Sequence, residues 1–225
     1  MEKISIARII RSKRKTLALE ITQDTRLIVR ASKSISNEYI EKIVHKKRFW
    51  IRNTQKAILE KNKRISPKEY VNGEGFLYLG NTYKLSIVDN SLEPLTFDNG
   101  FHFLKSCLPK AKETFIDWYK KEAYSKIKKR LDWYSESSGI EYKKMNITSA
   151  MKRWGSCNAE GGLSFSWRLI MTPLKVIDYV VAHELAHIVI RNHSEKFWTK
   201  VKMLIPDYKY SKNWLKDNGY SLNLK

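Results

Sequence analysis

Three of the five histidines in this chain fall within eleven positions, in the segment VVAHELAHIVIRNHSEKFW at residues 180–198. His183 and His187 are four residues apart, and residues at this spacing lie on one face of an α-helix, about one turn apart. His193 cannot share that face, because six residues turn an α-helix through about 600°, which leaves a net rotation of about 240°. The segment therefore predicts a helix that ends near residues 190–192, so that the chain can fold back at His193.

Local signals define both ends of this helix. Thr172 is a candidate N-cap and Pro173 suits the first helical position. Asn192 tolerates the left-handed conformation in which many helices end. Ser194 can cap a second helix that begins at the sequence EKFW. These signals predict two helices with a short turn between them.

The pattern HELAH at residues 183–187 has the form HExxH, which is typical of metal-dependent hydrolases. Two imidazoles on one helix face can bind one cation, and Glu184 lies where its carboxylate can reach a water molecule without being a ligand. A catalytic zinc ion generally takes three protein ligands and one water. His193 is the candidate for the third ligand, and three imidazoles favour zinc over magnesium or calcium. We therefore expect one Zn2+ per chain, held by His183, His187 and His193.

The rest of the chain predicts an α+β fold without internal repeats. Apolar residues alternate, as in strands, in several short segments: residues 15–22, 26–31, 76–88, 100–104, 145–150 and 161–169. Helical spacing covers residues 36–61 and 109–137. Within residues 76–88 we expect a hairpin that turns at Gly80 and Asn81. These patterns predict a β-rich N-terminal region with one helix over residues 1–105, followed by an α+β domain over residues 106–225.

The positive charge is concentrated near the N-terminus. The formal net charge is +20, and residues 1–64 carry 18 Lys and Arg against 6 Asp and Glu. Such a region can attract nucleic acid or nucleotides in a salt-dependent way. The alternative is a solvated lysine-rich surface, and no known nucleic-acid module accompanies the charge.

Other features indicate a soluble protein of the cytoplasm that we expect to be a monomer. No apolar run approaches the ~18 residues needed to cross a bilayer, and the first residues do not resemble a secretory signal. Cys107 and Cys157 suit a reducing compartment as free thiols. Cys157 is a poor candidate for a nucleophile, because no histidine stands near it in a triad-like context.

Two sets of motifs carry a resemblance to a known family. The segments RWGSC, LSFSWRLIMTPLKVIDYVVAHELAHIVIRNHSEKFW and PDY closely resemble the YgjP-like metallopeptidase domain family, whose relatives are the SprT and WLM proteases. The N-terminal segments RSKRKTLALEITQDTRLIVRAS and KKRFWI are also similar to that family. The resemblance implies a zincin-like metallopeptidase core behind a β-rich N-terminal region. It also implies that His183, His187 and His193 bind zinc and that Glu184 is the general base.

Further residues are candidates for substrate binding. Arg153 and Ser156, in the RWGSC turn, could contact the substrate or an oxyanion, although this turn could also serve packing alone. The strand LSFSWRL, which contains Ser164, could pair with an extended peptide or be an ordinary structural strand. Glu195 and Asp207 could orient a ligand imidazole or be solvated charges.

Three classes of function compete on this sequence. The first is a zinc-dependent peptidase with an unknown protein or peptide substrate, which nucleic acid could recruit as it recruits SprT-like proteases. The second is a metal-dependent nucleoside-triphosphate pyrophosphatase acting on UTP, although the chain has neither a carboxylate-rich magnesium site nor a Gly-rich phosphate loop. The third is a non-catalytic binding module that holds zinc for structure. Glu184 makes this class less favoured, because a structural zinc site does not need a base next to its ligand.

Overall fold

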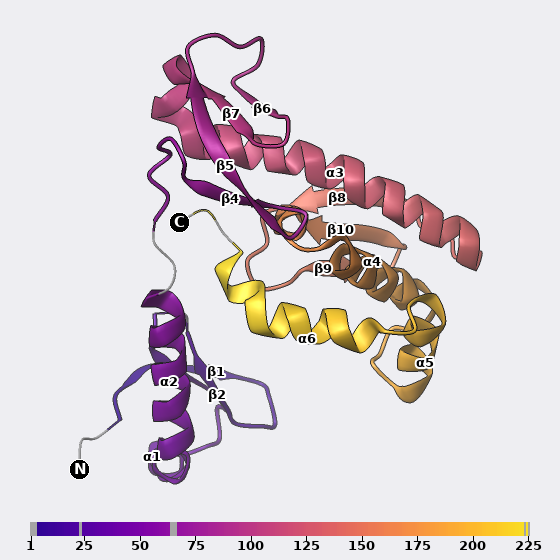
Figure 1. The fold of residues 1–225 in the computed structure, drawn as a ribbon. Helices are drawn as coiled ribbons and strands as arrows, with labels where there is room; N and C mark the ends of the chain where they lie inside the picture. The colour runs from indigo at the N-terminus through magenta and orange to yellow at the C-terminus, as the bar shows by residue number, and fades with distance from the viewer. Residues whose placement is uncertain (1–3, 23, 64–66, 223, 225) are drawn as a thin grey trace. The chain divides into compact units, whose positions relative to one another are not determined.

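The computed structural model describes residues 4–22, 24–63, 67–222 and 224, and the chain divides into two compact units, residues 1–66 and 67–225. Each unit has its own hydrophobic core. Both combine helices and strands (Figure 1), so the α+β class predicted from the sequence is confirmed. No helix among the described ranges is both long and apolar enough to cross a membrane.

The first unit is a three-stranded sheet with two helices. Its elements are β1 (Ile6–Ser12), β2 (Ala18–Ile21), β3 (Leu27–Ser32), α1 (Asn37–Lys46) and α2 (Arg48–Lys63). The central strand β3 pairs in parallel with β1 and antiparallel with β2. Alternate residues of β3 are buried, and they share a core with the helices. That core consists of Leu27, Val29, Ala31, Ile40, Val44 and Ile51.

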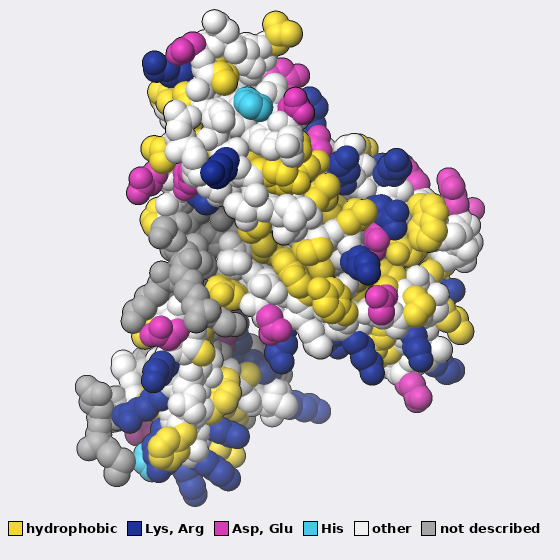
Figure 2. Space-filling view, in the orientation of Figure 1, with side chains coloured by type: hydrophobic (Ala, Val, Ile, Leu, Met, Phe, Trp, Pro, Cys, Tyr) yellow, Lys and Arg dark blue, Asp and Glu magenta, His cyan; other side chains and the backbone are white. Residues whose placement is uncertain are grey.

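The helical segment of this unit differs from its prediction in one respect. Residues 36–61 were expected to form one helix, whereas the structure has two, with Lys47 between them at φ −96° and ψ 12°. No proline or glycine marks that break in the sequence. Ser36 caps α1 as its residue type suggests, since its hydroxyl accepts a hydrogen bond from the Tyr39 N–H at 3.2 Å. Lys and Arg side chains crowd the visible surface of this unit (Figure 2).

The second unit is built around the 28-residue helix α3 (Ala111–Ser138). One sheet has the strand order β4-β5-β7-β6, and another has the order β8-β10-β9. The strands are β4 (Gly75–Tyr78), β5 (Asn81–Val88), β6 (Leu95–Phe97), β7 (Phe101–Leu104), β8 (Lys144–Thr148), β9 (Gly155–Cys157) and β10 (Gly162–Ser166). The helices α4 (Leu174–Val189), α5 (Glu195–Leu204) and α6 (Tyr208–Asn218) complete the unit.

The hairpin of β4 and β5 packs into the second unit. At its turn, the Leu79 N–H donates to the Ile170 carbonyl at 2.8 Å, and the Gly80 N–H donates to the Met171 carbonyl at 3.2 Å. Gly80 has φ +86°, and a Cβ there would lie 2.8 Å from the ring of Pro173. These contacts explain why the units divide between residues 66 and 67, earlier than the boundary at residue 105 expected from the sequence.

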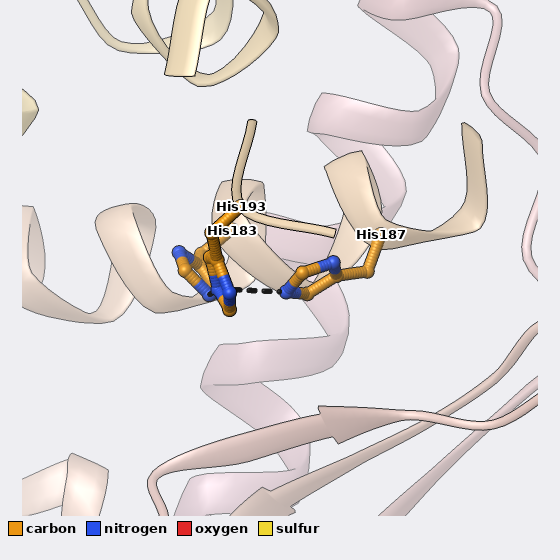
Figure 3. Close-up of side chains that lie close together, drawn as sticks. All are labelled: His183, His187 and His193. Atoms are coloured by element: carbon orange, nitrogen blue, oxygen red, sulfur yellow. Dashed lines mark hydrogen bonds between the residues drawn. The ribbon is translucent and has the colours of Figure 1, made fainter. Parts of the chain in front are cut away.

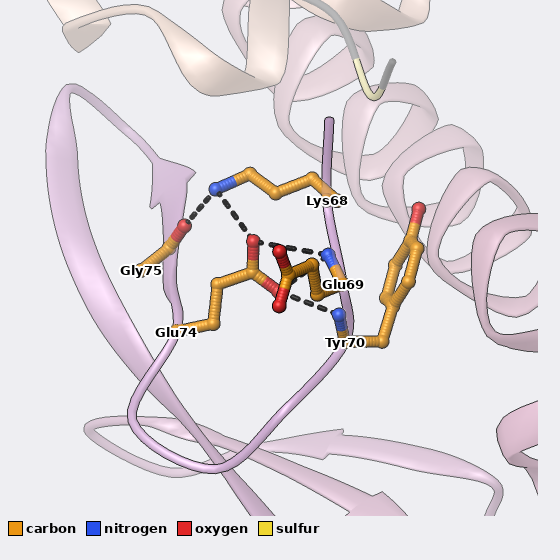
Figure 4. A network of polar contacts seen from close by, with 5 residues as sticks. All are labelled: Lys68, Glu69, Tyr70, Glu74 and Gly75. Atoms are coloured by element: carbon orange, nitrogen blue, oxygen red, sulfur yellow. Dashed lines mark hydrogen bonds and ion pairs between the residues drawn. The ribbon is translucent and has the colours of Figure 1, made fainter. Parts of the chain in front are cut away.

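A polar network fixes the start of the second unit (Figure 4). The Glu74 carboxylate accepts hydrogen bonds from the backbone N–H groups of Glu69, at 3.1 Å, and Tyr70, at 2.6 Å. The Lys68 ammonium donates to the Gly75 carbonyl at 2.6 Å and lies 3.5 Å from the Glu74 carboxylate. The segment at the start of the second unit is therefore a closed loop in which the backbone N–H groups of Glu69 and Tyr70 have hydrogen-bond acceptors.

The helix α4 begins one residue later than its predicted cap. The Pro173 carbonyl accepts hydrogen bonds from the N–H groups of Val176 and Ile177, so Pro173 is the N-cap. The prediction of Thr172 as the cap is wrong, because its hydroxyl donates to the Leu169 carbonyl at 2.8 Å instead. The helix ends at Val189, where the histidine spacing requires it to end.

The turn after α4 differs in detail from the prediction. Ile190, which follows the helix, is extended at φ −129° and ψ 106°, and Asn192 is not among the residues with positive φ. The Asn192 side chain instead accepts a hydrogen bond from the Ser194 N–H at 3.2 Å. Ser194 stands at the N-cap position of α5, as predicted, although its side chain makes no capping bond.

Candidate metal centre

The three histidines of the sequence motif converge on one point (Figure 3). His183 and His187 extend from the same face of α4, and His193 returns from the turn that follows it. The Nε2 atom of His193 lies 3.1 Å from Nε2 of His183 and 3.2 Å from Nε2 of His187. Among the described residues, this is the one group of three or more histidine, cysteine or carboxylate side chains with metal-binding spacing.

This spacing fits a tetrahedral metal ion. Two imidazole nitrogens bound to one zinc ion at 2.0–2.1 Å lie about 3.3 Å apart. Hydrogen bonds alone do not account for the cluster, because the Nε2 atom of His193 carries at most one hydrogen and faces two other nitrogens. The Nδ1 atom of His187 faces the Ile190 carbonyl at 3.1 Å and must be the donor there. When this imidazole is neutral, its Nε2 lone pair therefore points to the shared centre.

The surroundings of the histidines favour their neutral, metal-binding form. Burial is the largest cause that lowers the pKa of His183 to about 3, and the neighbouring imidazoles and Lys212 contribute in the same direction. Burial also lowers the pKa of His187, against the effect of the Ile190 carbonyl. A neutral imidazole binds a metal without first losing a proton.

An aromatic side chain holds all three imidazoles in place. The fully buried ring of Phe197 lies 4.9 Å from the ring of His183, 4.4 Å from that of His187 and 4.8 Å from that of His193, between centroids. Phe197 is in the first turn of α5 and packs into the core of the second unit. The helix after His193 thus fixes the position of the third imidazole.

Glu184 lies beside these histidines and is buried. Its side chain is 6% exposed, and burial raises its pKa to about 7, against the opposing charge of Arg153. The β9 backbone passes directly over this carboxylate at Gly155. A Cβ at Gly155 would lie 2.6 Å from Oε1 and 2.7 Å from Cδ of Glu184, so only glycine fits there without a shift.

A cleft runs between α4 and β9 past this carboxylate. Its first hollow, of about 310 Å³, is lined by the three histidines. Its second hollow, of about 280 Å³, lies toward the N-terminal half of α4. The hollows share Gly155, His183 and Glu184. The first adds Ser156, Cys157, His187, Arg191 and His193, and the second adds Trp154, Tyr179, Val180, Lys212 and Leu215.

The substrate-binding candidates from the sequence lie in different places. Ser156 lines the first hollow, whereas Arg153 lines neither hollow and acts on Glu184 through its charge. Ser164 lies in β10, opposite Ser156 of β9, and also lines neither hollow. Of the two alternatives for the LSFSWRL strand, the structure supports an ordinary structural strand, because β10 lies between β8 and β9 and has no free edge. Beside the metal centre, the edge strand is β9.

Other candidates from the sequence take no direct part in the centre. Among the described side chains, neither Glu195 nor Asp207 forms a hydrogen bond to a histidine, and the Ile190 carbonyl fills that position for His187. Burial raises the pKa of the Cys157 thiol against the effect of Arg191, so this cysteine is not activated as a nucleophile.

Two cationic residues of the cleft gave no signal in the sequence. The Arg191 guanidinium donates to the Asn158 carbonyl at 2.5 Å and to the Ala159 carbonyl at 2.9 Å, which ties the loop after β9 to the end of α4. Lys212 comes from α6. Nothing in the sequence distinguishes them from the other Lys and Arg residues, which number 43 in total with these two, and only the fold places them in the cleft.

Solved structures and a family model are similar to parts of this chain. The crystal structure of the metallopeptidase zymogen of Pyrococcus abyssi abylysin is similar, with 17% identity and a TM-score of 0.37, over 40% of this chain and 93% of that one. The zymogen of Methanocaldococcus jannaschii jannalysin has 20% identity and a TM-score of 0.36, over 42% and 95%. No curated protein matches the chain. The model of the YgjP-like metallopeptidase domain matches residues 15–218, and the chain therefore belongs to this family of metallopeptidases.

Proposed function

We propose that this metallopeptidase is a zinc enzyme that hydrolyses peptide bonds, with His183, His187 and His193 as the zinc ligands and Glu184 as the general base. The observation that carries the proposal is the convergence of three Nε2 atoms, 3.1 and 3.2 Å apart, beside a buried carboxylate. A structural zinc site needs a fourth protein ligand. The described residues offer three, which leaves a position open for substrate or water.

The chain's own residues supply the proton transfers. Zinc held by the three imidazoles would act as a Lewis acid that polarises the scissile carbonyl and makes a water molecule more acidic. Glu184 takes a proton from the attacking water and passes it to the leaving amine. In the metal-free chain burial raises the pKa of the Glu184 carboxyl to about 7, toward the range in which a general base works best.

The free edge of β9 supports binding of an extended peptide. β9 pairs with β10 on one side only, and its residues Gly155, Ser156 and Cys157 line the first hollow. A substrate strand added to this edge would place its backbone beside Glu184. Ser156 is then close to the scissile bond and is the first residue of this strand to test.

The test combines metal analysis with activity on the full chain. We expect one zinc ion per chain by mass spectrometry, and much less after His193→Ala. The matched control is His102→Ala, which removes a histidine from β7, outside the cleft. Glu184→Gln should retain zinc and lose peptidase activity by at least about a hundredfold. Zinc binding that survives His193→Ala, or peptidase activity that survives Glu184→Gln, would refute the proposal.

The alternative of UTP pyrophosphatase activity has no support in the residues described. Besides the three histidines, they contain no cluster of carboxylates able to hold magnesium. The same samples test it, because pyrophosphate release from UTP that depends on Glu184 would assign the centre to phosphate chemistry.

A further inference from the structure

The second hollow of the cleft carries one fixed positive charge. It extends from Glu184 along α4 and is lined by Lys212 of α6, with Trp154, Tyr179, Val180 and Leu215 forming apolar walls. Glu184, at the end shared with the first hollow, is the one carboxylate that lines it. An apolar hollow with a single charge at its rim is typical of a site that selects one kind of side chain.

An aromatic ring holds the Lys212 ammonium in position. The Nζ atom lies 4.0 Å from the centroid of the Trp198 ring, a cation–π contact. Trp198 in turn contacts the rings of His183 and His193, at 5.8 Å from each. The exposed Lys212 side chain is therefore joined to His183 and His193 through the ring of Trp198.

No ion pair among the described residues of the second unit uses this charge. No carboxylate of the described residues lies within ion-pair distance of Lys212, and a cation–π contact leaves the ammonium charge available. Arg191, in the first hollow, differs because its guanidinium already donates to two loop carbonyls. Of the two cations in the cleft, Lys212 is the one that is free to bind a ligand.

We propose that the hollow at Lys212 is a specificity subsite that binds a carboxylate of the substrate, close to the scissile bond. An extended peptide that follows β9 from the first hollow to the second brings one of its side chains to Lys212. The carboxylate belongs to an acidic side chain or to the free C-terminus of the peptide. This inference rests on the proposed peptidase function, and it predicts a preference for anionic peptides over neutral and cationic ones.

The test measures binding, so that it does not depend on finding a substrate. The probes are succinyl-type hydroxamates, designed to bind the zinc ion of the full chain. Each carries glutamate, glutamine or lysine next to its metal-binding group and has an amidated end. Calorimetry should show the glutamate compound binding about fivefold more tightly than the glutamine compound, as for a partly exposed ion pair. A glutamine compound with a free carboxyl end separates binding of the chain end from binding of the side chain.

Variants of one helix complete the test. Lys212→Met keeps an apolar stem against Trp198 and should abolish the preference, whereas Lys212→Glu should reverse it in favour of lysine. The matched control is Lys209→Glu, an exposed residue of α6 outside the hollow, which should leave the preference unchanged. Zinc content is measured in each variant, so that a lost metal is not mistaken for a lost subsite.

The outcomes separate the two proposals. Equal affinity for the glutamate and glutamine compounds, absence of hydroxamate binding, or a preference that survives Lys212→Met would overturn the subsite. A Lys212-dependent preference without any Glu184-dependent peptide hydrolysis would leave the subsite standing and refute the peptidase function. Hydrolysis of peptides without preference for acidic residues would overturn the subsite and leave the peptidase function standing.

Discussion

Glu184→Gln should make the metal-free protein more stable while it abolishes activity. The Glu184 carboxyl is 6% exposed, and burial raises its pKa from 4.5 to about 7. At about 1.4 kcal/mol for each pKa unit, ionising this group in the folded protein costs about 3 kcal/mol more than in the unfolded chain. Glutamine has nearly the same shape and no charge, so the variant avoids this cost.

The sign of the pH dependence follows from the direction of the shift. Below pH 4.5 the carboxyl is neutral in both states, and the two proteins should have similar free energies of unfolding. Between pH 4.5 and 7 the folded parent retains the proton that the unfolded chain loses, so the stability of the parent falls relative to the variant as pH rises. Above pH 7 the difference should reach its full value of about 3 kcal/mol.

Urea unfolding of the chelator-treated parent and variant, at pH 4.5, 6 and 8, measures this difference. Both proteins share every other titrating group, including the histidines, so their contributions cancel in the comparison. Zinc should reduce the gap, because a neighbouring positive charge favours the ionised carboxylate. Equal stabilities at pH 8, or a gap that does not change with pH, would show that Glu184 ionises in the folded protein without cost.

Three further substitutions test single contacts. Gly155→Ala should retain zinc and lower peptidase activity by at least about tenfold, because its methyl group displaces the Glu184 carboxylate; activity equal to that of the parent would refute this role. Gly80→Ala should lower the free energy of unfolding by about 2 kcal/mol in urea, since φ is +86° and the site is closed by a proline ring. Arg130→Met should lower the free energy of unfolding by about 2 kcal/mol in the same assay, because it leaves Asp178 without its bidentate partner, now at 2.5 and 2.9 Å. A change within about 0.5 kcal/mol, which is typical of surface sites, would contradict this prediction.

The convergence of the three histidines could be predicted, because its signals are local. The four-residue spacing of His183 and His187 is a property of one helix, and the six-residue step to His193 requires that helix to end. The structure ends it at Val189. Chain geometry over eleven residues is therefore enough to predict that the three imidazoles can approach one another.

The cleft could not be predicted, because it depends on contacts between distant segments. The strand at its edge, β9, has three residues, too few for an alternating pattern, whereas the more regular β10 lies in the middle of the sheet. Lys212 reaches the cleft only because α6 packs beside α4. The boundary between the units has the same cause, since the hydrogen bond from Gly80 to Met171, before α4, joins residues 91 positions apart.

The packing of α5 links the local motif to the rest of the fold. His193 lies on a turn, where backbone geometry alone leaves a side chain poorly defined. The buried Phe197 ring removes that freedom, since it contacts all three imidazoles and belongs to the core of the second unit. The adjacent Trp198 extends the same stack to Lys212. Two adjacent aromatic residues of α5 thus contact both the third imidazole and the cation that we assign to substrate selection.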